Sequence, residues 1–181
     1  METMAGRSPA RAPMGAVAIY PGSFDPPTLG HVSLVERGLA VFDRIIVAVA
    51  KNPLKGALFS VDERVELLRE SLAERFPDGR IEIDRFEGLT VDYARRKGAA
   101  AILRGLRATS DFEFEFRMAM MNRHLEKDIH SVFLMADHRW FFISSSTVKE
   151  AASLGADVSD LVPEPVARRL RSKYPPEPRE G

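Results

Sequence analysis

Short apolar segments alternate with amphipathic segments along most of the chain. Four short apolar runs and one stretch of alternating apolar and charged residues predict strands. Between these runs, apolar residues recur at the spacing of a helix that buries one face. The predicted strands are residues 16–20, 44–50, 80–86, 99–103 and 131–136. The predicted helices are residues 31–41, 61–74, 91–97, 111–125, 145–154 and 163–173.

Capping residues support two of these helix starts. Ser60 with Glu63, and Ser110 with Glu113, form capping boxes, in which a serine and a glutamate three residues later satisfy amide groups at a helix start. Residues 111–116 alternate charged residues with phenylalanine, which by itself is typical of a strand. The capping box and the residues that follow it favour a helix there.

The order of these elements predicts the fold. Strand, helix and strand follow one another within about 35 residues, the length of a βαβ unit with parallel strands. We therefore expect one α/β domain over residues 16–174, a Rossmann-like doubly wound fold with a mainly parallel five-stranded sheet and C-terminal helices. Residues 1–15 are expected to form a flexible leader and residues 175–181 a flexible tail.

Composition excludes several classes of protein. The chain has no cysteine, which excludes a disulfide scaffold, thiol catalysis and cysteine-ligated zinc. Its 26 basic and 26 acidic residues give zero formal net charge, whereas nucleic-acid-binding domains usually carry a basic excess. No apolar run reaches the ~20 residues of a transmembrane helix, and no signal peptide is evident. We therefore expect a cytoplasmic protein that binds neither nucleic acid nor membrane, and the histidine spacing predicts no metal site.

The loop after the first strand combines features of a phosphate-binding site. Gly22 and Gly30 permit close approach of the backbone to a ligand, and the helix start supplies free amide groups. Thr28 and His31 lie about one helical turn apart, so both can face one phosphate. Neither a P-loop nor a dinucleotide-binding motif is present.

A second candidate segment opens the helix predicted at residue 145. Residues 144–147 are four consecutive hydroxyl-bearing residues, and Thr147 with Glu150 forms a further capping box. Helix capping needs one hydroxyl. The segment therefore fits either capping alone or a cradle for a triphosphate.

Basic residues follow two other predicted strands. Arg104 and Arg107 come directly after the fourth strand and either bind phosphate or lie on the surface. Lys55 lies in the loop after the second strand, at the same edge of the sheet. Because ligands of such sheets bind beyond the carboxyl ends of the strands, these residues are candidates for one anion site.

Several motifs in this order resemble one enzyme family. Thr28-Leu29-Gly30-His31 and Ile143-Ser144-Ser145-Ser146 look like the two nucleotide-binding motifs of the nucleotidylyltransferase superfamily. A closer resemblance, to the bacterial phosphopantetheine adenylyltransferases, covers about residues 16–173. The segments that carry it are residues 20–26, 104–107, 111–115, 121–125, 132–135 and 140–146.

The resemblance implies an activity, partners and a site. Members of this family transfer AMP from ATP to 4′-phosphopantetheine and are typically Mg²⁺-dependent cytoplasmic homohexamers, the Mg²⁺ accompanying ATP. By resemblance, His31 binds ATP and stabilises the transition state, while Ser23 contacts substrate phosphate. Lys55 and Arg104 are implied to hold the phosphate of phosphopantetheine, and Thr90 to line the pantetheine site. The implied ATP contacts are Ser23, Phe24, His31, Gly105, Leu106, Arg107, Glu115, Trp140, Phe141, Phe142, Ile143, Ser144, Ser145 and Ser146.

The sequence departs from the family pattern at two site residues, and two other functions are alternatives. Ser23 stands where threonine is usual but keeps the hydroxyl, and Thr90 stands where methionine or leucine is common. An enzyme acting on nicotinate mononucleotide or a cytidylyltransferase is a second interpretation, and residues 104–107 and 111–115 argue against it. A non-catalytic nucleotide-binding regulator is a third. The motif histidine and the basic residues implied to hold phosphate, which are all present, argue against that one.

Overall fold

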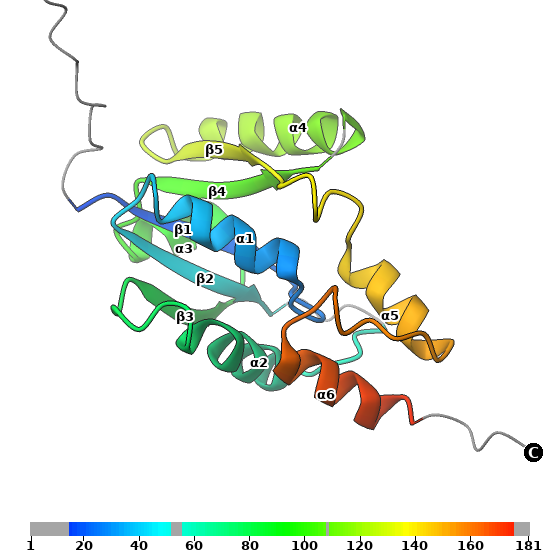
Figure 1. Cartoon of the computed structure of the whole chain (residues 1–181). Coiled ribbons are helices and arrows are strands. Elements are labelled where there is room, and N and C mark those ends of the chain that lie inside the picture. Colours follow the sequence, from blue (N-terminus) through cyan, green and yellow to red (C-terminus); the bar gives the residue numbers. More distant parts are fainter. Residues whose placement is uncertain (1–14, 52–55, 108, 176–181) are drawn as a thin grey trace, which may run out of the picture.

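Five parallel strands form the centre of the molecule in a computed structural model that describes residues 15–51, 56–107 and 109–175 (Figure 1). The strands are β1 Val17–Gly22, β2 Arg44–Ala50, β3 Ile81–Phe86, β4 Ala101–Leu106 and β5 His130–Met135. They lie in the order β3-β2-β1-β4-β5, and every neighbouring pair is parallel. The predicted α/β fold with a five-stranded parallel sheet is confirmed.

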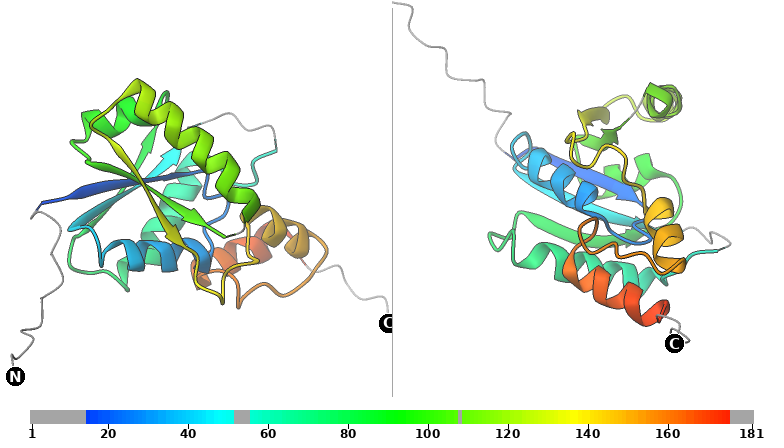
Figure 2. Two further views of the ribbon diagram at one scale, coloured as in Figure 1. Left: turned by 90° about the horizontal axis from the view of Figure 1, so that it is seen from above. Right: turned by 45° about the vertical axis from the view of Figure 1, so that its right-hand side comes forward.

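Helices cover both faces of this sheet, as a doubly wound fold requires (Figures 1 and 2). They are α1 Leu29–Gly38, α2 Val61–Ala73, α3 Thr90–Arg96, α4 Thr109–Leu125, α5 Ser145–Ser153 and α6 Glu164–Lys173. Successive residues of a strand point to opposite faces. Tyr20 therefore packs with Val35 of α1 and Leu68 of α2, whereas Ile19 packs with Val91 of α3. Because both faces are covered, β2 is buried almost throughout.

The two C-terminal helices form a third apolar cluster beyond the carboxyl ends of the strands (Figure 2). Val148 of α5 and Leu170 of α6 pack there with Phe59, which lies just before α2. The amide of Leu29, at the start of α1, donates a hydrogen bond to the carbonyl of Leu161 at 3.0 Å. The predicted C-terminal helices thereby lie beside the loop that follows β1.

Most of the predicted helix starts agree with the structure. Ser60 is the N-cap of α2, and it forms the predicted capping box with Glu63. Residues 111–116 are helical, as the following residues indicated. The helix begins at Thr109, however, so Ser110 lies inside it and is not its N-cap. The helix therefore begins two residues before the predicted start at residue 111.

Strand β4 is longer than predicted. The run of apolar residues stops at Leu103, but the strand continues to Leu106. In this extension, Arg104, Gly105 and Leu106 pair with successive residues of β5. Ladder hydrogen bonds, which do not depend on side-chain polarity, extend the strand through a polar residue. Arg104 thus projects from a strand and not from a loop.

Three predictions concern parts of the chain that the structure does not describe. Lys55 lies outside the described residues, as do nearly all of the predicted leader 1–15 and tail 175–181. None of the helices in the described parts of the chain combines the length and hydrophobicity needed to cross a bilayer.

Candidate active site

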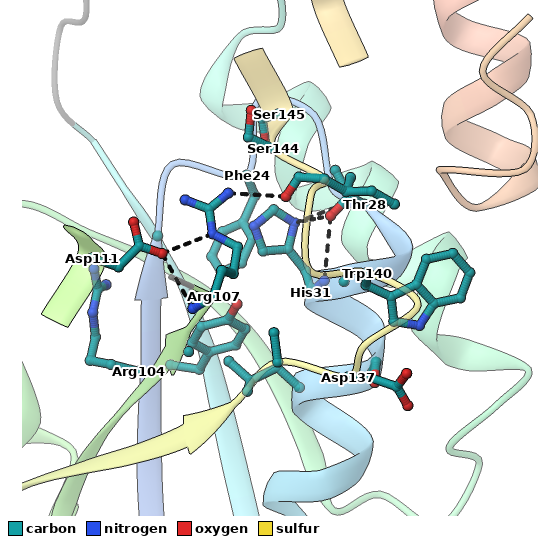
Figure 3. Close-up of a pocket in the computed structure, with 18 of the residues that line it drawn as sticks. Phe24, Thr28, His31, Arg104, Arg107, Asp111, Asp137, Trp140, Ser144 and Ser145 are labelled. Atoms are coloured by element: carbon teal, nitrogen blue, oxygen red, sulfur yellow. Dashed lines mark hydrogen bonds and ion pairs between the residues drawn. The ribbon is translucent and has the colours of Figure 1, made fainter. Parts of the chain in front are cut away.

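A cavity of about 460 Å³ opens at the carboxyl ends of β1 and β4 (Figure 3). β1 and β4 are neighbours at the point where the strand order reverses, and in doubly wound folds ligands bind at this position. The walls come from the β1–α1 loop, the first turns of α1, the end of β4, α4, and the segment from β5 to α5. Segments that lie far apart in the sequence therefore meet at one site.

His31 is held in one orientation by the start of α1. Thr28 is the N-cap, and its amide and hydroxyl lie 2.9 Å and 3.0 Å from His31 Nδ1. Since the amide can only donate, Nδ1 accepts and the ring proton resides on Nε2. Thr28, only 2% exposed, uses its hydroxyl for the helix cap and for a contact with the imidazole. Thr28 also lines the cavity together with His31, and that both can face one phosphate stays a prediction.

The charge state of His31 follows from its surroundings. Burial, and then the nearby guanidinium groups of Arg107 and Arg104, lower the pKa of His31 from 6.5 to about 4. At neutral pH the ring is therefore uncharged. It offers one donor, Nε2–H, to whatever occupies the cavity that it lines.

The β1–α1 loop is shaped around a buried phenylalanine. Phe24 has a φ of +48°, a left-handed conformation that costs energy outside glycine, and it is 1% exposed. Its ring contacts Tyr20 and His31 edge-on, with centroids 5.3 Å and 5.1 Å away. A Cβ at Gly22 would lie 2.9 Å from this ring, so only glycine fits there. Ser23, beside Phe24, lines the cavity as predicted.

Arg104 and Glu115 form a bidentate ion pair that connects β4 to α4. Arg104 Nε donates to one carboxylate oxygen of Glu115 at 2.8 Å, and its second terminal nitrogen contacts the other oxygen. Arg104 also donates to the carbonyl of Pro21 at 2.9 Å. The sequence implied separate contacts for these two side chains, with phosphopantetheine and with ATP. In the structure they contact each other.

Arg107 bridges two further walls of the cavity (Figure 3). It donates to Asp111 of α4 at 3.1 Å and to the carbonyl of Ile143 at 3.0 Å. Asp111 lines the cavity, but the sequence analysis did not assign it to the site. The four-residue spacing between Arg107 and Asp111 was the available signal.

Three of the four consecutive hydroxyls at the start of α5 form hydrogen bonds within the protein. Ser144 is the N-cap and accepts from the amide of Thr147 at 3.0 Å, so the predicted box of Thr147 with Glu150 is wrong. Ser145 donates to the carbonyl of Pro26 at 2.8 Å, and Thr147 contacts the Ser144 hydroxyl at 2.6 Å. The hydroxyl of Ser146 has no hydrogen-bond partner among the described residues, and it lines the cavity. Hydrogen bonds within the protein thus account for the hydroxyls of Ser144, Ser145 and Thr147, but not for that of Ser146.

The structure brings together most of the residues implied by resemblance. Those that line the cavity are Ser23, Phe24, His31, Arg104, Gly105, Arg107, Glu115, Trp140, Ile143, Ser144, Ser145 and Ser146. Phe141 and Phe142 are largely exposed, and Leu106 is buried. None of these three is part of the lining. A Cβ at Gly105 would lie 3.1 Å from a methyl group of Leu34, so a larger residue there requires the Leu34 side chain to shift.

A second, smaller cavity shares a wall with the first. It has a volume of about 230 Å³, and most of its lining is apolar. Thr90, at the start of α3, lies in it together with Met118 and Phe133. Arg104 and Glu115 line both cavities, so their ion pair lies between the two spaces.

One buried carboxylate beside the site was missed by the sequence analysis. Asp25, 3% exposed, accepts from the amides of Leu58 and Phe59 at 3.0 Å and 2.9 Å and from Lys149 Nζ at 2.6 Å. Burial alone would raise the pKa of Asp25, but the hydrogen bonds from Lys149 and the two amides outweigh it and lower that pKa. Its partner on α5 is too distant in the sequence for any local pattern to reveal it.

The carboxylates of the main cavity do not form a metal site. Asp111, Glu115 and Asp137 are each paired with an arginine. Across the described ranges, no group of three or more acidic or histidine side chains could hold a metal ion. A divalent cation at this site would therefore take its ligands chiefly from the substrate and water, as Mg²⁺ does on nucleotide phosphates.

The class of protein follows from this fold, this site and a family comparison. Residues 19–151 match the family described as cytidylyltransferase-like. A crystal structure of a Vibrio parahaemolyticus protein, assigned provisionally as a nicotinate-nucleotide adenylyltransferase, superposes with a TM-score of 0.63. The two chains share 18% identity over 88% of this chain and 93% of that one, which supports the fold alone. The chain is a nucleotidyltransferase of the cytidylyltransferase-like family.

Curated relatives define the family more narrowly. A phosphopantetheine adenylyltransferase of Oleidesulfovibrio alaskensis is 55% identical over 160 residues, 88% of this chain and 92% of that protein. The enzymes of the same name from Anaeromyxobacter sp. strain K and Syntrophus aciditrophicus are 50% and 49% identical. They are matched over 99% and 96% of their lengths and over 92% and 90% of this chain. The chain belongs to the phosphopantetheine adenylyltransferase family.

Proposed function

We propose that this chain transfers AMP from ATP to 4′-phosphopantetheine, giving dephospho-coenzyme A and pyrophosphate in coenzyme A biosynthesis. One observation carries the proposal beyond the family name. A polar cavity at the switch point of the sheet adjoins an apolar cavity, and Arg104 lines both. The reaction joins ATP and phosphopantetheine through the phosphate of the acceptor, so the two substrates need adjoining sites that meet at a phosphate-binding group. The nucleotide occupies the polar space and the pantetheine arm the apolar one.

The polar cavity supplies the groups that a bound triphosphate requires. Arg107 contributes a guanidinium, and the start of α5 contributes amide groups together with the hydroxyl of Ser146. Trp140, also in the lining, offers an aromatic surface to the base. Mg²⁺ enters as part of the substrate MgATP.

The acceptor phosphate is assigned to Arg104. A guanidinium has five N–H donors, and the contacts with Glu115 and Pro21 use three of them. Two donors remain for a phosphate, while Glu115 keeps the group in place. Thr90 and the apolar lining of the second cavity receive the pantetheine arm. Lys55 is included from the sequence resemblance alone.

The residues fit a single in-line displacement. An oxygen of the acceptor phosphate attacks the α-phosphorus of ATP, and the bond from that phosphorus to the bridging oxygen of the β-phosphate breaks as pyrophosphate leaves. A phosphate oxygen is already a nucleophile, so neither a strong base nor a covalent intermediate is required. Catalysis then consists of positioning and charge stabilisation. In this proposal His31 Nε2–H donates to the α-phosphate oxygens as charge builds there, which the contact at Nδ1 and the position in the cavity lining support.

The assembly is also proposed, and an apolar face supports it. Phe112 and Phe116 stack on the outer side of α4 and are 48% and 50% exposed, and Met120, Met121 and Leu125 are exposed on the same helix. A monomer rarely leaves so much large apolar surface in water. The homohexamer implied by the family would cover it. ATP as a substrate supports the expected cytoplasmic location.

Pyrophosphate release from MgATP tests the activity. 4′-Phosphopantetheine is compared with nicotinate mononucleotide as acceptor, and the product is identified by mass. Release with phosphopantetheine alone, with formation of dephospho-coenzyme A, is the expected result. Release of pyrophosphate only with the mononucleotide would show that the proposed acceptor, phosphopantetheine, is wrong. No release with either acceptor, in a folded chain that binds ATP, would favour a regulator.

A further inference from the structure

The two walls of the nucleotide cavity are joined by an ion pair, between a buried carboxylate and a partly exposed ammonium group, that has no part in the chemistry above. One wall is the β1–α1 loop, which carries Ser23 and leads to His31. The other is the start of α5. Asp25 of the loop and Lys149 of α5 contact each other at 2.6 Å, although 124 residues separate them in the sequence.

The carboxylate of Asp25 connects more than two segments. It also accepts the amides of Leu58 and Phe59, which lie at the approach to α2. From α2, Arg64 donates to the carbonyl of Ser23 at 2.7 Å, although its side chain is only 2% exposed. Charged groups that lie almost wholly away from solvent thus fix the loop on both sides of Phe24, the residue with the left-handed backbone.

A purely stabilising role explains this arrangement poorly. Burying the carboxylate of Asp25 and most of the Lys149 side chain costs part of what the attraction between the charges returns, so the pair is weak support for stability. The apolar cluster of α5, α6 and Phe59 already holds these helices together. Fixed geometry is what the pair adds, because a short charged contact tolerates little displacement.

We propose that Asp25 and Lys149 are positioning residues for the nucleotide: their ion pair fixes the separation between the β1–α1 loop and the start of α5, so that both walls bind one ATP. Two neutral hydrogen bonds support the same connection, from Ser145 to the carbonyl of Pro26 and from Leu29 to that of Leu161. Neither Asp25 nor Lys149 belongs to the lining of the cavity. The inference rests on the proposed function for the identity of the nucleotide.

The ion pair of Asp25 and Lys149 should affect the binding of ATP but not the binding of the acceptor. The apolar cavity is built from β4, β5, α3 and α4, with Pro21 at its edge, and α5 contributes nothing to its lining. Loosening α5 therefore weakens the nucleotide site and leaves the acceptor site in place. When the walls are no longer held, part of the binding energy of ATP is spent on bringing them together.

The test uses Lys149→Met, Lys149→Arg and a matched control. Lys173→Met removes an ion pair between α6 and Glu63 of α2, which has a separation of 3.2 Å, and neither of these residues lines the cavity. Trp140 is the only tryptophan of the chain and lines the cavity, so its fluorescence reports MgATP binding without turnover. KM for each substrate and the melting temperature are measured as well.

Lys149→Met is expected to weaken MgATP binding about tenfold and to raise KM for ATP by a similar factor, while KM for the acceptor changes less than about twofold. Lys149→Arg should restore MgATP binding to within about threefold of the wild type, since it keeps the charge. Lys173→Met should lower the melting temperature without affecting MgATP binding. If Lys149→Met does not fold, Lys149→Gln, which keeps a donor but no charge, takes its place.

Unchanged MgATP binding in the Lys149 variants would overturn the proposal. Equal losses for both substrates, or equal losses in Lys173→Met, would also overturn it, because they would indicate a general effect on folding. The binding measurement needs no acceptor. A wild-type chain that binds MgATP but does not adenylylate phosphopantetheine would refute the proposed function and leave this test intact.

Discussion

Replacing His31 by alanine separates catalysis from helix capping. The substitution removes the Nε2–H donor and also the side chain that closes the capping box of α1. Thr28→Val is the matched control. It removes the hydroxyl from the same cap but leaves the imidazole and the amide of residue 28 that orients it.

The expected sizes of the two effects differ. Losing one donor to the charge that develops in a transition state lowers kcat by about 10²–10³, or about 2.7–4 kcal/mol. Losing a helix-cap interaction lowers the free energy of unfolding by ~1 kcal/mol, and His31→Ala also loses the edge-on contact with Phe24, worth up to about another 1 kcal/mol. For a domain of this size, each kcal/mol lowers the melting temperature by roughly 2–4 °C.

Steady-state kinetics at saturating MgATP and phosphopantetheine, with thermal unfolding of the same samples, test the prediction. Both variants should be somewhat less stable, and only His31→Ala should lose more than about tenfold in kcat. A loss below that level in a folded His31→Ala variant would refute the assigned role. An equal loss of kcat in Thr28→Val would show that the helix cap, and not the Nε2–H donor, is responsible for the effect of His31→Ala on kcat.

Five other outcomes are expected. The low pKa of His31 predicts that its imidazole resonances in an NMR titration show no protonation between pH 7 and 5, and an inflection at the ordinary value of 6.5 would contradict a neutral ring. The folded chain holds this histidine uncharged while the unfolded chain protonates below pH 6.5. The wild type should therefore lose about 1–3 kcal/mol of stability, relative to His31→Ala, as the pH falls from 6.5 towards 4, measured by denaturant unfolding. Arg104→Met should raise KM for phosphopantetheine more than KM for ATP and, because it leaves the buried Glu115 unpaired, lower stability by about 2–3 kcal/mol. An acceptor KM that stays at the wild-type value would disprove that assignment. Gly22→Ala should destabilise the chain by about 1–3 kcal/mol in thermal unfolding, because the added methyl group collides with the ring of Phe24. Phe116→Lys should reduce the molecular mass measured by light scattering, and an unchanged mass would exclude the α4 face as the contact between subunits.

The fold was predictable because its signals are local. Strands buried on both faces read as continuous apolar runs, and β2 matches its predicted bounds at Arg44 and Ala50. The box of Ser60 with Glu63 marked the start of α2 for the same reason, since both residues lie within one turn. At the site, the motif residues also converge on one cavity, because the carboxyl ends of parallel strands share an edge.

The remaining features depend on contacts that no short window contains. β4 continues past Leu103 because β5 pairs with it. The spacing of Thr28 and His31 suits a phosphate site as well as a helix cap, and the contact between their side chains across the start of α1 is not readable from that spacing alone. The pairing of Asp25 with Lys149 is likewise invisible in the sequence, because any acidic residue of the first half could have been the partner.

The lining of the nucleotide cavity begins at Tyr20 and ends at Ser146, and this span has a consequence for synthesis. Domains commonly fold as they leave the ribosome, and the sheet has all its strands once β5 has emerged. The wall formed by α5 is still missing at that stage, and with it Lys149. A nascent or prematurely terminated chain can therefore have a finished sheet and still lack the side of the cavity that Ser145 and Ser146 line. Under the proposed function, such a truncated product is expected to bind ATP less tightly than the finished molecule does.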